Sequence, residues 1–386
     1  MLKHIFIDNF KSFDHFDMNI PQFAVIVGNN GVGKSNLLKA IKLISLLAAQ
    51  KSIKDAFIEL ELVNNELFHD ATNPKFTITL EFNVNGVDIK YLLEITQINE
   101  PSGNFNFIVS KEVLENSKQI IYREGDKIII NTEEGIPQSN VQLVNSQIAL
   151  SVIAQPKIVV ETQRYLSRMK IDIFDVSKLR NPGSMSNIGP GLNKNLTESL
   201  YSLKTTGPNN YSEIEREAKE LIMGLENLSV EDQAGNLFIT FKEISHNNPL
   251  SVFSTSDGNL RLIGILTSIL GDPKPSVVII DELENSMHPK RIRALMKFLN
   301  YLSDKESGGT QFIFTTHSPI ILKFVQEKDI MYMFKDNGKT QISKPVNNKK
   351  IYEHLAKAKD KDLDLGDLFL TGTLEDIYKL GINKTE

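Results

Sequence analysis

A glycine-rich loop at residues 28–35 is the part of the sequence whose residue types and spacing point most directly to chemistry. It reads Gly-Asn-Asn-Gly-Val-Gly-Lys-Ser. Backbone N–H groups in such a loop can point at one phosphate, and the positive end of a following helix adds to the attraction. The Lys34 ammonium would reach the β- and γ-phosphates, and the Ser35 hydroxyl would bind Mg²⁺. The loop therefore predicts a site for ATP with Mg²⁺, a purely structural turn being the alternative. The residues expected at this site are Asn29, Asn30, Gly31, Val32, Gly33, Lys34, Ser35 and Asn36.

Two carboxylates follow an apolar strand expected at residues 276–280. They belong to Asp281 and Glu282. In open α/β sheets, ligands bind beyond the carboxyl ends of the strands. We therefore expect Asp281 to hold Mg²⁺, mainly through water, and Glu282 to polarise the water that attacks the γ-phosphate. The alternative for Glu282 is a carboxylate that stabilises the positive end of a helix.

Two histidines stand close to this acidic pair in the sequence. His317 follows the strand expected at residues 310–315, and His288 opens the next predicted helix at 289–303. At a strand tip, a neutral imidazole could contact the γ-phosphate and sense its loss, so His317 is a candidate catalytic residue. A structural role is its alternative. For His288, helix capping and a contact between subunits both remain open.

A second helix N-terminus suited to anions lies just upstream, in the signature segment at residues 253–262. Ser256 is a good N-cap, and Gly258 leaves the backbone open at the start of a helix expected at 258–270. A second anion site would be explained if it bound the nucleotide that is held by another subunit. An ordinary helix cap is the alternative.

The elements that must position these groups indicate an α/β protein with an inserted antiparallel sheet. A fully apolar strand at 23–27 precedes the glycine-rich loop, and a helix at 36–47 follows it. Strict alternation within 75–132, with a turn at Asn85-Gly86, predicts antiparallel strands. No heptad pattern is sustained, which argues against a long coiled-coil arm. The remaining expected elements are helical structure at 139–170, an irregular loop region at 178–211, a helix at 211–227, a hairpin at 229–243 and a helix at 318–325.

The composition narrows the class of protein. The chain has 386 residues, 41% of them hydrophobic and 24% charged, a net charge of −5 and no cysteine. Disulfides, thiolate zinc sites and a cysteine nucleophile are thereby excluded. No apolar run approaches the length of a membrane-spanning helix, so we expect a cytoplasmic protein without membrane contact. The net charge predicts no dominant basic surface, although a local basic patch is compatible with it.

Taken together, the motifs resemble the ABC-type ATPase heads of the SMC, RecF and OLD group. Residues 30–38 resemble its Walker A motif, and residues 281–289 its "DEPE-x-x-LHP" motif. Residues 256–261 resemble its "SDGT-x-R" signature, with Asn259 where threonine is usual. Residues 316–319 resemble its switch histidine motif. The opening run at 9–13 is similar to "N-F-[RK]-S-F", which implies that Lys11 approaches the nucleotide.

The resemblance implies an ATPase head in three segments. These are an N-terminal part with Walker A and the antiparallel block (1–135), a helical or irregular lobe (136–250), and a C-terminal part with the signature, acidic pair and switch histidine (251–386). It also implies a head-to-tail homodimer, or a higher oligomer, with ATP between Walker A of one copy and the signature of the other. The family's Q-loop glutamine has three candidates, Gln97, Gln147 and Gln163.

The expected partner is a separate effector. OLD-type nucleases carry a C-terminal Toprim domain, and the segment after His317 is too short for one. The chain therefore resembles the ATPase subunits of bacterial anti-phage systems such as Septu, the retron-associated pairs and PARIS, which control a nuclease or toxin. A RecF-like ATPase that binds DNA during repair or recombination is the alternative, and a transport ATPase fits the motifs poorly.

Two charged groups remain open to different interpretations. A set of basic residues could line a path for DNA or simply be solvated. Its members are Arg164, Arg168, Lys170, Lys178, Arg180 and Lys194. An acidic run near the C-terminus is interpreted as a solvated face and not as a metal site. It contains Asp360, Asp362, Asp364 and Asp367.

Overall fold

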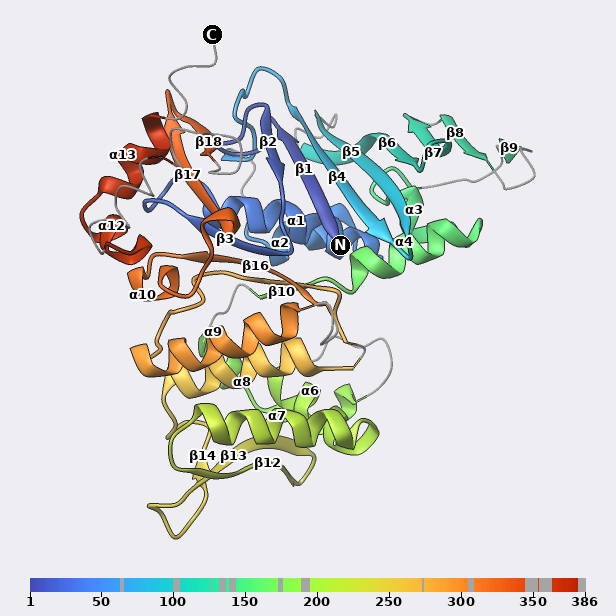
Figure 1. Cartoon of the computed structure of the whole chain (residues 1–386). Coiled ribbons are helices and arrows are strands. Elements are labelled where there is room, and N and C mark those ends of the chain that lie inside the picture. The colour runs from blue at the N-terminus through green and yellow to red at the C-terminus, as the bar shows by residue number, and fades with distance from the viewer. Residues whose placement is uncertain are drawn as a thin grey trace. The chain divides into compact units, whose positions relative to one another are not determined.

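The computed structural model describes most of the chain, which divides into two compact units. One unit contains residues 1–169 and 325–386, and the other contains 170–324 (Figure 1). The residues described are 1–380 without 63–65, 100–104, 126, 132–136, 139–143, 173–175, 189–194, 273, 305–308, 344–352 and 354–362.

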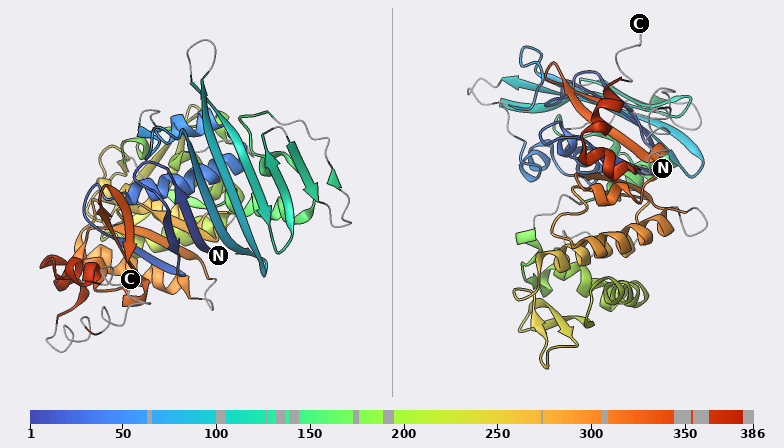
Figure 2. Two further views of the ribbon diagram at one scale, coloured as in Figure 1. Left: turned by 90° about the horizontal axis from the view of Figure 1, so that it is seen from above. Right: turned by 60° about the vertical axis from the view of Figure 1, so that its left-hand side comes forward.

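The first unit contains an eight-stranded antiparallel sheet, whose strands lie side by side in the view from above (Figure 2). Its order is β2-β1-β4-β5-β6-β7-β8-β9. The bounds are β1 (Leu2–Asp8), β2 (Phe16–Asn19), β4 (Lys75–Val84), β5 (Val87–Asn99), β6 (Phe105–Glu115), β7 (Gln119–Glu124), β8 (Lys127–Asn131) and β9 (Pro137–Gln138). The predicted antiparallel block is confirmed, as is its turn. Val84 pairs with Val87 across Asn85 and Gly86, both at positive φ, as a two-residue hairpin turn requires.

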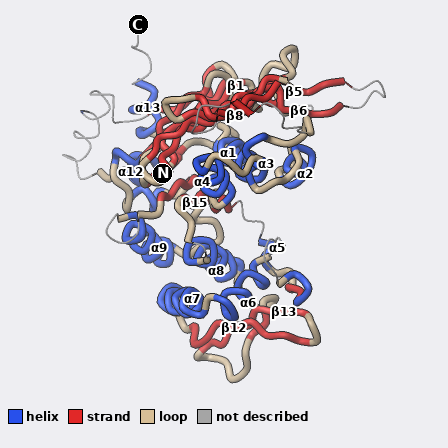
Figure 3. Tube along the Cα trace, turned by 90° about the vertical axis from the view of Figure 1, so that its right-hand side faces the viewer, coloured by secondary structure: helices blue, strands red, loops and turns tan. Residues whose placement is uncertain are grey.

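Helices cover one face of this sheet (Figure 3). They are α1 (Lys34–Ala48), α2 (Ile53–Glu59), α3 (Ala149–Val152) and α4 (Lys157–Ser167). The strand β3 (Phe23–Val27), buried along its whole length, leads into α1 and pairs in parallel with β17 (Ile330–Asp336). A buried strand followed by a helix is the arrangement expected for the glycine-rich loop. The hairpin partner of β17 is β18 (Lys339–Ser343), and α12 (Leu365–Leu370) and α13 (Thr373–Leu380) follow.

The second unit has three parallel strands and a smaller antiparallel sheet. The parallel strands are β10 (Lys170–Asp172), β15 (Val277–Ile280) and β16 (Gln311–Thr316), with β15 between the other two. The antiparallel strands are β11 (Gly183–Ser184), β12 (Leu225–Gln233), β13 (Asn236–Glu243) and β14 (Leu250–Ser251). The α-helices are α5 (Val176–Leu179), α6 (Leu196–Thr206), α7 (Pro208–Leu221), α8 (Asp257–Leu270), α9 (Pro289–Ser303) and α10 (Pro319–Leu322).

The region at 178–211 departs from the predicted loop. It contains α6, which begins with a capping box. The Asn195 side chain accepts a hydrogen bond from the Glu198 N–H, and the Glu198 carboxylate accepts one from the Asn195 N–H, each at 2.9 Å. The glycines and prolines lie around this helix, and Pro208 begins the next one. The prediction of a wholly irregular segment was therefore wrong, because local capping was overlooked beside the helix-breaking residues.

Candidate functional site

The glycine-rich loop joins β3 to α1 and has a conformation that requires glycine at particular positions. Gly31 and Gly33 have φ values of 76° and 110°, in the left-handed region, and Gly33 is the N-cap of α1. At Gly28, a Cβ atom would come within 2.1 Å of the Met333 carbonyl oxygen on β17. The spacing of glycines in the sequence therefore follows from one turn into the helix and one close approach to a neighbouring strand.

Lys34 lies buried inside this loop. Its Nζ donates hydrogen bonds to the carbonyl oxygens of Gly28 and Asn29, each at 2.8 Å. The ammonium is thus held by neutral acceptors in the loop where the phosphates are expected, and an anion would be a stronger partner for it. Ser35, next along the helix, is exposed, so its hydroxyl is open to a metal ion.

A pair of hydroxyl groups supports the loop from behind. A Cβ atom on Gly33 would lie 2.7 Å from Thr340 Oγ1 and 2.8 Å from Ser12 Oγ. The fully buried Thr340 donates its hydroxyl proton to the Val32 carbonyl oxygen at 2.7 Å, and its N–H donates to the Ser12 carbonyl oxygen at 2.8 Å. These two residues fix the loop conformation. The sequence analysis predicted a role for neither Ser12 nor Thr340, although Ser12 directly follows Lys11, which was predicted to approach the nucleotide.

Lys11 lies in the loop between β1 and β2 that carries Ser12. The backbone of Lys11 has a φ of 53°, and its N–H donates to the Leu67 carbonyl oxygen at 2.7 Å. Burial, followed by repulsion from Lys39, lowers the pKa of the Lys11 ammonium. An approaching phosphate would relieve both effects, which is compatible with the predicted nucleotide contact.

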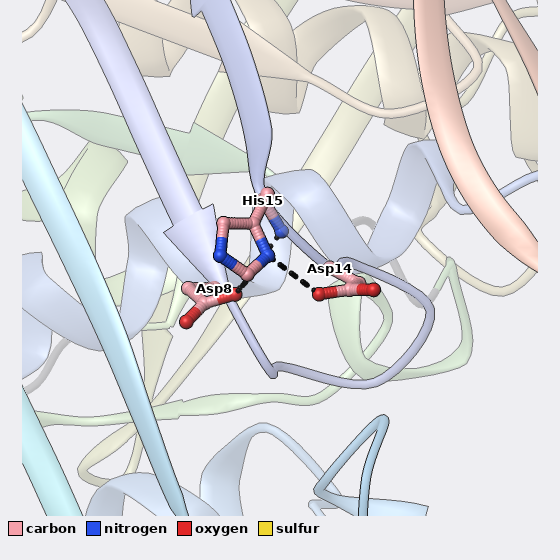
Figure 4. A group of neighbouring side chains, drawn as sticks. All are labelled: Asp8, Asp14 and His15. Carbon is pink, nitrogen blue, oxygen red and sulfur yellow. Dashed lines mark hydrogen bonds and ion pairs between the residues drawn. The ribbon is translucent and has the colours of Figure 1, made fainter.

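A group of three charged side chains closes the same β1–β2 loop (Figure 4). The His15 Nδ1 atom lies 2.7 Å from an Asp14 carboxylate oxygen and 3.1 Å from one of Asp8. Lys339, on β18, forms an ion pair with Asp14. The hydrogen bond to Asp14, with the nearby Asp8 charge, raises the pKa of His15. Two carboxylates thus face Lys339 and an imidazole whose protonated form they favour, and the group fastens the β1–β2 loop to the strand that carries Thr340.

The acidic strand end lies in the second unit and is organised by a single hydroxyl. Thr315 Oγ1, on β16, donates to Asp281 Oδ1 at 2.5 Å and accepts from the Glu282 N–H at 2.7 Å. Glu282 has a φ of 47°, so the chain turns sharply between the two carboxylates. The two adjacent carboxylates have different partners, because Glu282 Oε2 accepts a hydrogen bond from Asn285 Nδ2 at 3.4 Å, and this is compatible with their different predicted roles in metal binding and proton transfer.

His317, the predicted sensor, is held through its backbone by a third carboxylate that the sequence did not single out. Glu284 accepts hydrogen bonds from the Thr316 hydroxyl at 2.9 Å and from the His317 N–H at 2.6 Å. It stands two residues after Glu282, so one short loop carries both the predicted base and the anchor of the predicted sensor. The signal that could have revealed Glu284 is the second acidic residue in the Asp-Glu-Leu-Glu run.

The signature segment is held by two arginines, one of which joins it to the acidic strand end. The buried Arg261, on α8, donates to the carbonyl oxygens of Asp281 and Glu282 at 2.5 and 2.8 Å. Arg180 contacts the segment from its other side. Its guanidinium donates to the carbonyl oxygens of Val252 and Thr255 and to Asp257. Arg180 was considered for a DNA path or as a solvated residue, but its partners lie within the protein.

Both predicted residues of the signature lie at the start of α8. Ser256 is exposed and caps the helix, its Oγ accepting a hydrogen bond from the Asn259 N–H at 3.2 Å. Gly258 is required by packing, because a Cβ atom there would come within 2.1 Å of the Ser286 carbonyl oxygen. His288 caps α9 by accepting from the Lys290 N–H at 3.3 Å, which favours the capping interpretation of that histidine.

Several predicted side chains have structural partners or lie outside the described part of the chain. Gln163 donates to the Ala48 carbonyl oxygen at the C-terminal end of α1, the end remote from the glycine-rich loop, and the choice of Q-loop glutamine among Gln97, Gln147 and Gln163 stays open. Asp364 and Asp367 form the capping box of α12. Lys194, Asp360 and Asp362 are outside the described residues. No helix in the described part of the chain is long and apolar enough to cross a membrane.

Comparison with known proteins agrees with this geometry. A Helicobacter pylori protein named "ATP/GTP phosphatase" is 23% identical over 354 residues, covering 87% of this chain and 91% of that one. The protein "DNA replication and repair protein RecF" of Clostridium acetobutylicum is 23% identical over 292 residues, covering 67% of this chain and 71% of its own. These similarities support an ATPase.

Solved structures show the fold. A structure of an SMC head bound to the C-winged helix domain of ScpA matches with a TM-score of 0.55 and 15% identity, over 88% of this chain and 96% of that one. A second SMC head, with an extended coiled coil and bound to the C-terminal domain of ScpA from Pyrococcus furiosus, matches with a TM-score of 0.53 and 14% identity, over 88% and 95%. The predicted α/β fold of the ABC-type ATPase head is therefore confirmed, and no long coiled coil occurs among the described residues.

A family model matches residues 23–323, which include the glycine-rich loop, the signature segment, the acidic pair and His317. That match covers most of the chain. The protein is an ATPase with the fold of an SMC head, and it belongs to the family described as "AAA domain, putative AbiEii toxin, Type IV TA system".

Proposed function

We propose that this ATPase acts as a nucleotide-dependent dimer. In the proposed complex, the glycine-rich loop and Asp281 bind MgATP, Glu282 is the general base and His317 senses the γ-phosphate. The signature segment of a second copy completes the site. The observation that carries this proposal is the attachment of the signature helix to the acidic strand end through Arg261, which spans 2.5 Å to the Asp281 carbonyl oxygen. A shift of the backbone at Asp281 or Glu282 would therefore move Arg261 and the signature helix α8 that carries it.

The proposed output is a change of assembly. ATP would hold two copies together and hydrolysis would release them, so that nucleotide state becomes a switch. From the motif resemblance we propose that the switch controls a separate nuclease or toxin in an anti-phage complex. The alternative is a RecF-like ATPase that acts on DNA, which the 23% identity to RecF supports.

The dimer is tested with Glu282→Gln, a change that keeps the size of the side chain and removes the base. Its molar mass is measured by light scattering with ATP, with ADP and without nucleotide, and Lys34→Ala in the same background is the control. We expect a dimer only with ATP and intact Lys34, and hydrolysis slowed at least about a hundredfold. A monomer under all conditions, or hydrolysis at the wild-type rate, would refute the proposal.

The effector is tested by co-expression of the chain with its neighbouring reading frames, followed by purification through a tag on the ATPase. A nuclease or toxin that co-purifies, and whose activity depends on Glu282, supports the defence role. If no such protein co-purifies and the ATPase instead binds DNA with a steep salt dependence, the RecF-like alternative is favoured.

A further inference from the structure

An arginine beside the signature helix has no role in the site described so far. Arg291 lies in the first turn of α9. A Cβ atom on Gly258 would lie 3.3 Å from its Nη1 atom, so the guanidinium is packed against the N-terminal turn of α8. The same glycine is covered by the Ser286 carbonyl, in the loop that leads to α9. Arg291 therefore stands at the predicted anion-binding end of the signature helix.

The charge of Arg291 is not balanced by the protein. Its side chain is half-buried and makes no hydrogen bond or ion pair with any described residue, while burial lowers the pKa of its guanidinium. Two other arginines at the signature differ in this respect. Arg261 donates to two carbonyl oxygens, and Arg180 forms an ion pair with Asp257.

The neighbouring helix end increases this imbalance. The first backbone N–H groups of α8 carry partial positive charge and point outward from the helix end. A guanidinium packed against them is repelled, and partial burial weakens its hydration. An anion that reached this position would relieve both costs, and a planar guanidinium is well suited to hold two phosphate oxygens.

We propose that Arg291 binds the γ-phosphate of the ATP held by the glycine-rich loop of a second copy, together with the Ser256 hydroxyl and the N-terminus of α8. This inference rests on the proposed dimer. Arg291 remains a cation near neutral pH and transfers no proton; it stabilises the charge on the γ-phosphate oxygens as the bond to the β-phosphate breaks. Hydrolysis would remove the anion and restore the unbalanced charge, which would favour separation of the two copies.

The first test measures dimer formation by ATP in the Glu282→Gln background, with Arg291→Gln or Arg291→Lys added. Arg293→Ala serves as the matched control, because Arg293 is on the same helix but is exposed and stacked 5.6 Å over the Phe324 ring. We expect Arg291→Gln to raise the ATP concentration needed for dimerisation at least about tenfold, as loss of a charged hydrogen bond predicts. Arg291→Lys should recover part of the loss, and Arg293→Ala should have no effect.

Binding of ATP to the monomer separates this role from misfolding. Because the glycine-rich loop that binds the nucleotide belongs to the other copy, Arg291→Gln should keep the wild-type affinity of the isolated chain for ATP and its midpoint of thermal unfolding. In the wild-type background, kcat should fall about a hundredfold while monomer affinity is unchanged. Equal dimerisation of Glu282→Gln with and without Arg291→Gln would overturn the inference. Failure of Glu282→Gln itself to dimerise would instead refute the proposed function.

A mixing experiment tests action on the second copy. Chains with Arg291→Gln and chains with Lys34→Ala are each expected to be inactive. Mixed one to one, they should recover about a quarter of the wild-type rate, because half of the dimers are mixed and each contains one complete site. No recovery would mean that Arg291 serves its own copy. If inorganic phosphate alone causes dimerisation, or if Arg291→Gln weakens only DNA binding, the anion is a different one and the inference fails.

Discussion

The two parts of the candidate site are held together in different ways. In the first unit, the glycine-rich loop is supported by Thr340, which is 308 residues away in the sequence from its partner Val32. In the second unit, the carboxylates of Asp281 and Glu284 are held by hydroxyls from the next parallel strand, 34 and 32 residues away. The support of the glycine-rich loop forms only when β18, near the C-terminal end of the chain, packs beside it. The support of the carboxylates arises within one strand-helix-strand unit.

This difference has a consequence for the effect of substitutions. A change at the acidic end should act on chemistry, because the Thr315 hydroxyl and the Glu284 carboxylate form hydrogen bonds with the predicted catalytic residues or with a residue beside them. A change behind the glycine-rich loop should act on nucleotide affinity and on folding together, because Thr340 joins three chain segments. Substitutions in each of the two parts test this contrast.

Lys34→Ala should have the largest effect. The substitution removes the one buried ammonium in the described part of the glycine-rich loop, and no other cation there can replace it. We expect ATP affinity to fall at least about a hundredfold, equivalent to about 3 kcal/mol. Titration calorimetry with ATP measures this, and Lys42→Ala, a partly exposed lysine nearer the C-terminal end of the same helix, is the control. Binding within tenfold of wild type would show that the loop is a structural turn.

Glu284→Gln should come next, with an effect on rate alone. One carboxylate oxygen becomes an amide NH₂ that faces a donor, either the Thr316 hydroxyl or the His317 N–H. An unsatisfied donor costs about 1–3 kcal/mol, so the His317 loop should shift. We expect kcat to fall about tenfold or more with ATP affinity unchanged. Steady-state hydrolysis and ATP binding are measured together, with the exposed Glu220→Gln as control. An equal loss of affinity and rate would remove the contrast between the two parts.

Thr340→Val should reduce affinity and stability together. Valine has nearly the same shape but leaves the Val32 carbonyl oxygen without its 2.7 Å hydrogen bond. We expect the free energy of unfolding to fall by about 1–2 kcal/mol and ATP affinity to fall about tenfold. Thr340→Ser retains the hydroxyl and should recover the affinity. Denaturant unfolding and ATP titration give both quantities; a stability loss with unchanged affinity would make Thr340 a core residue only.

The difference between local contacts and contacts of distant segments also explains which features could be predicted from the sequence. The glycine spacing, the apolar strands and the Asp-Glu pair are local patterns, so they predicted β3, α1 and the strand end at Asp281. Thr340 could not be found in this way, because one threonine in a short strand has no pattern and its partners are set by the tertiary fold. The helix α6 was missed for another reason. The density of glycine and proline around it outweighed the Asn195–Glu198 capping box, which was local and visible.

The smallest effect is expected at His15. Its pKa is raised by Asp14 and Asp8, so the stabilising contribution of the protonated imidazole is complete below about pH 6.5, the ordinary value for histidine, and disappears as the pH rises through the raised value. His15→Gln should therefore lower the midpoint of thermal unfolding at about pH 5.5 and leave it nearly unchanged at about pH 8.5. The effect should be small, because the His15 side chain is 77% exposed and solvent screens its charge. Lys339 keeps its ion pair with Asp14 in the variant, so the β1–β2 loop should stay fastened and ATP affinity should hold at both pH values. A fall in affinity on substitution, confined to high pH where the imidazole is neutral, would contradict this account, because it would require a nucleotide contact by the neutral ring itself.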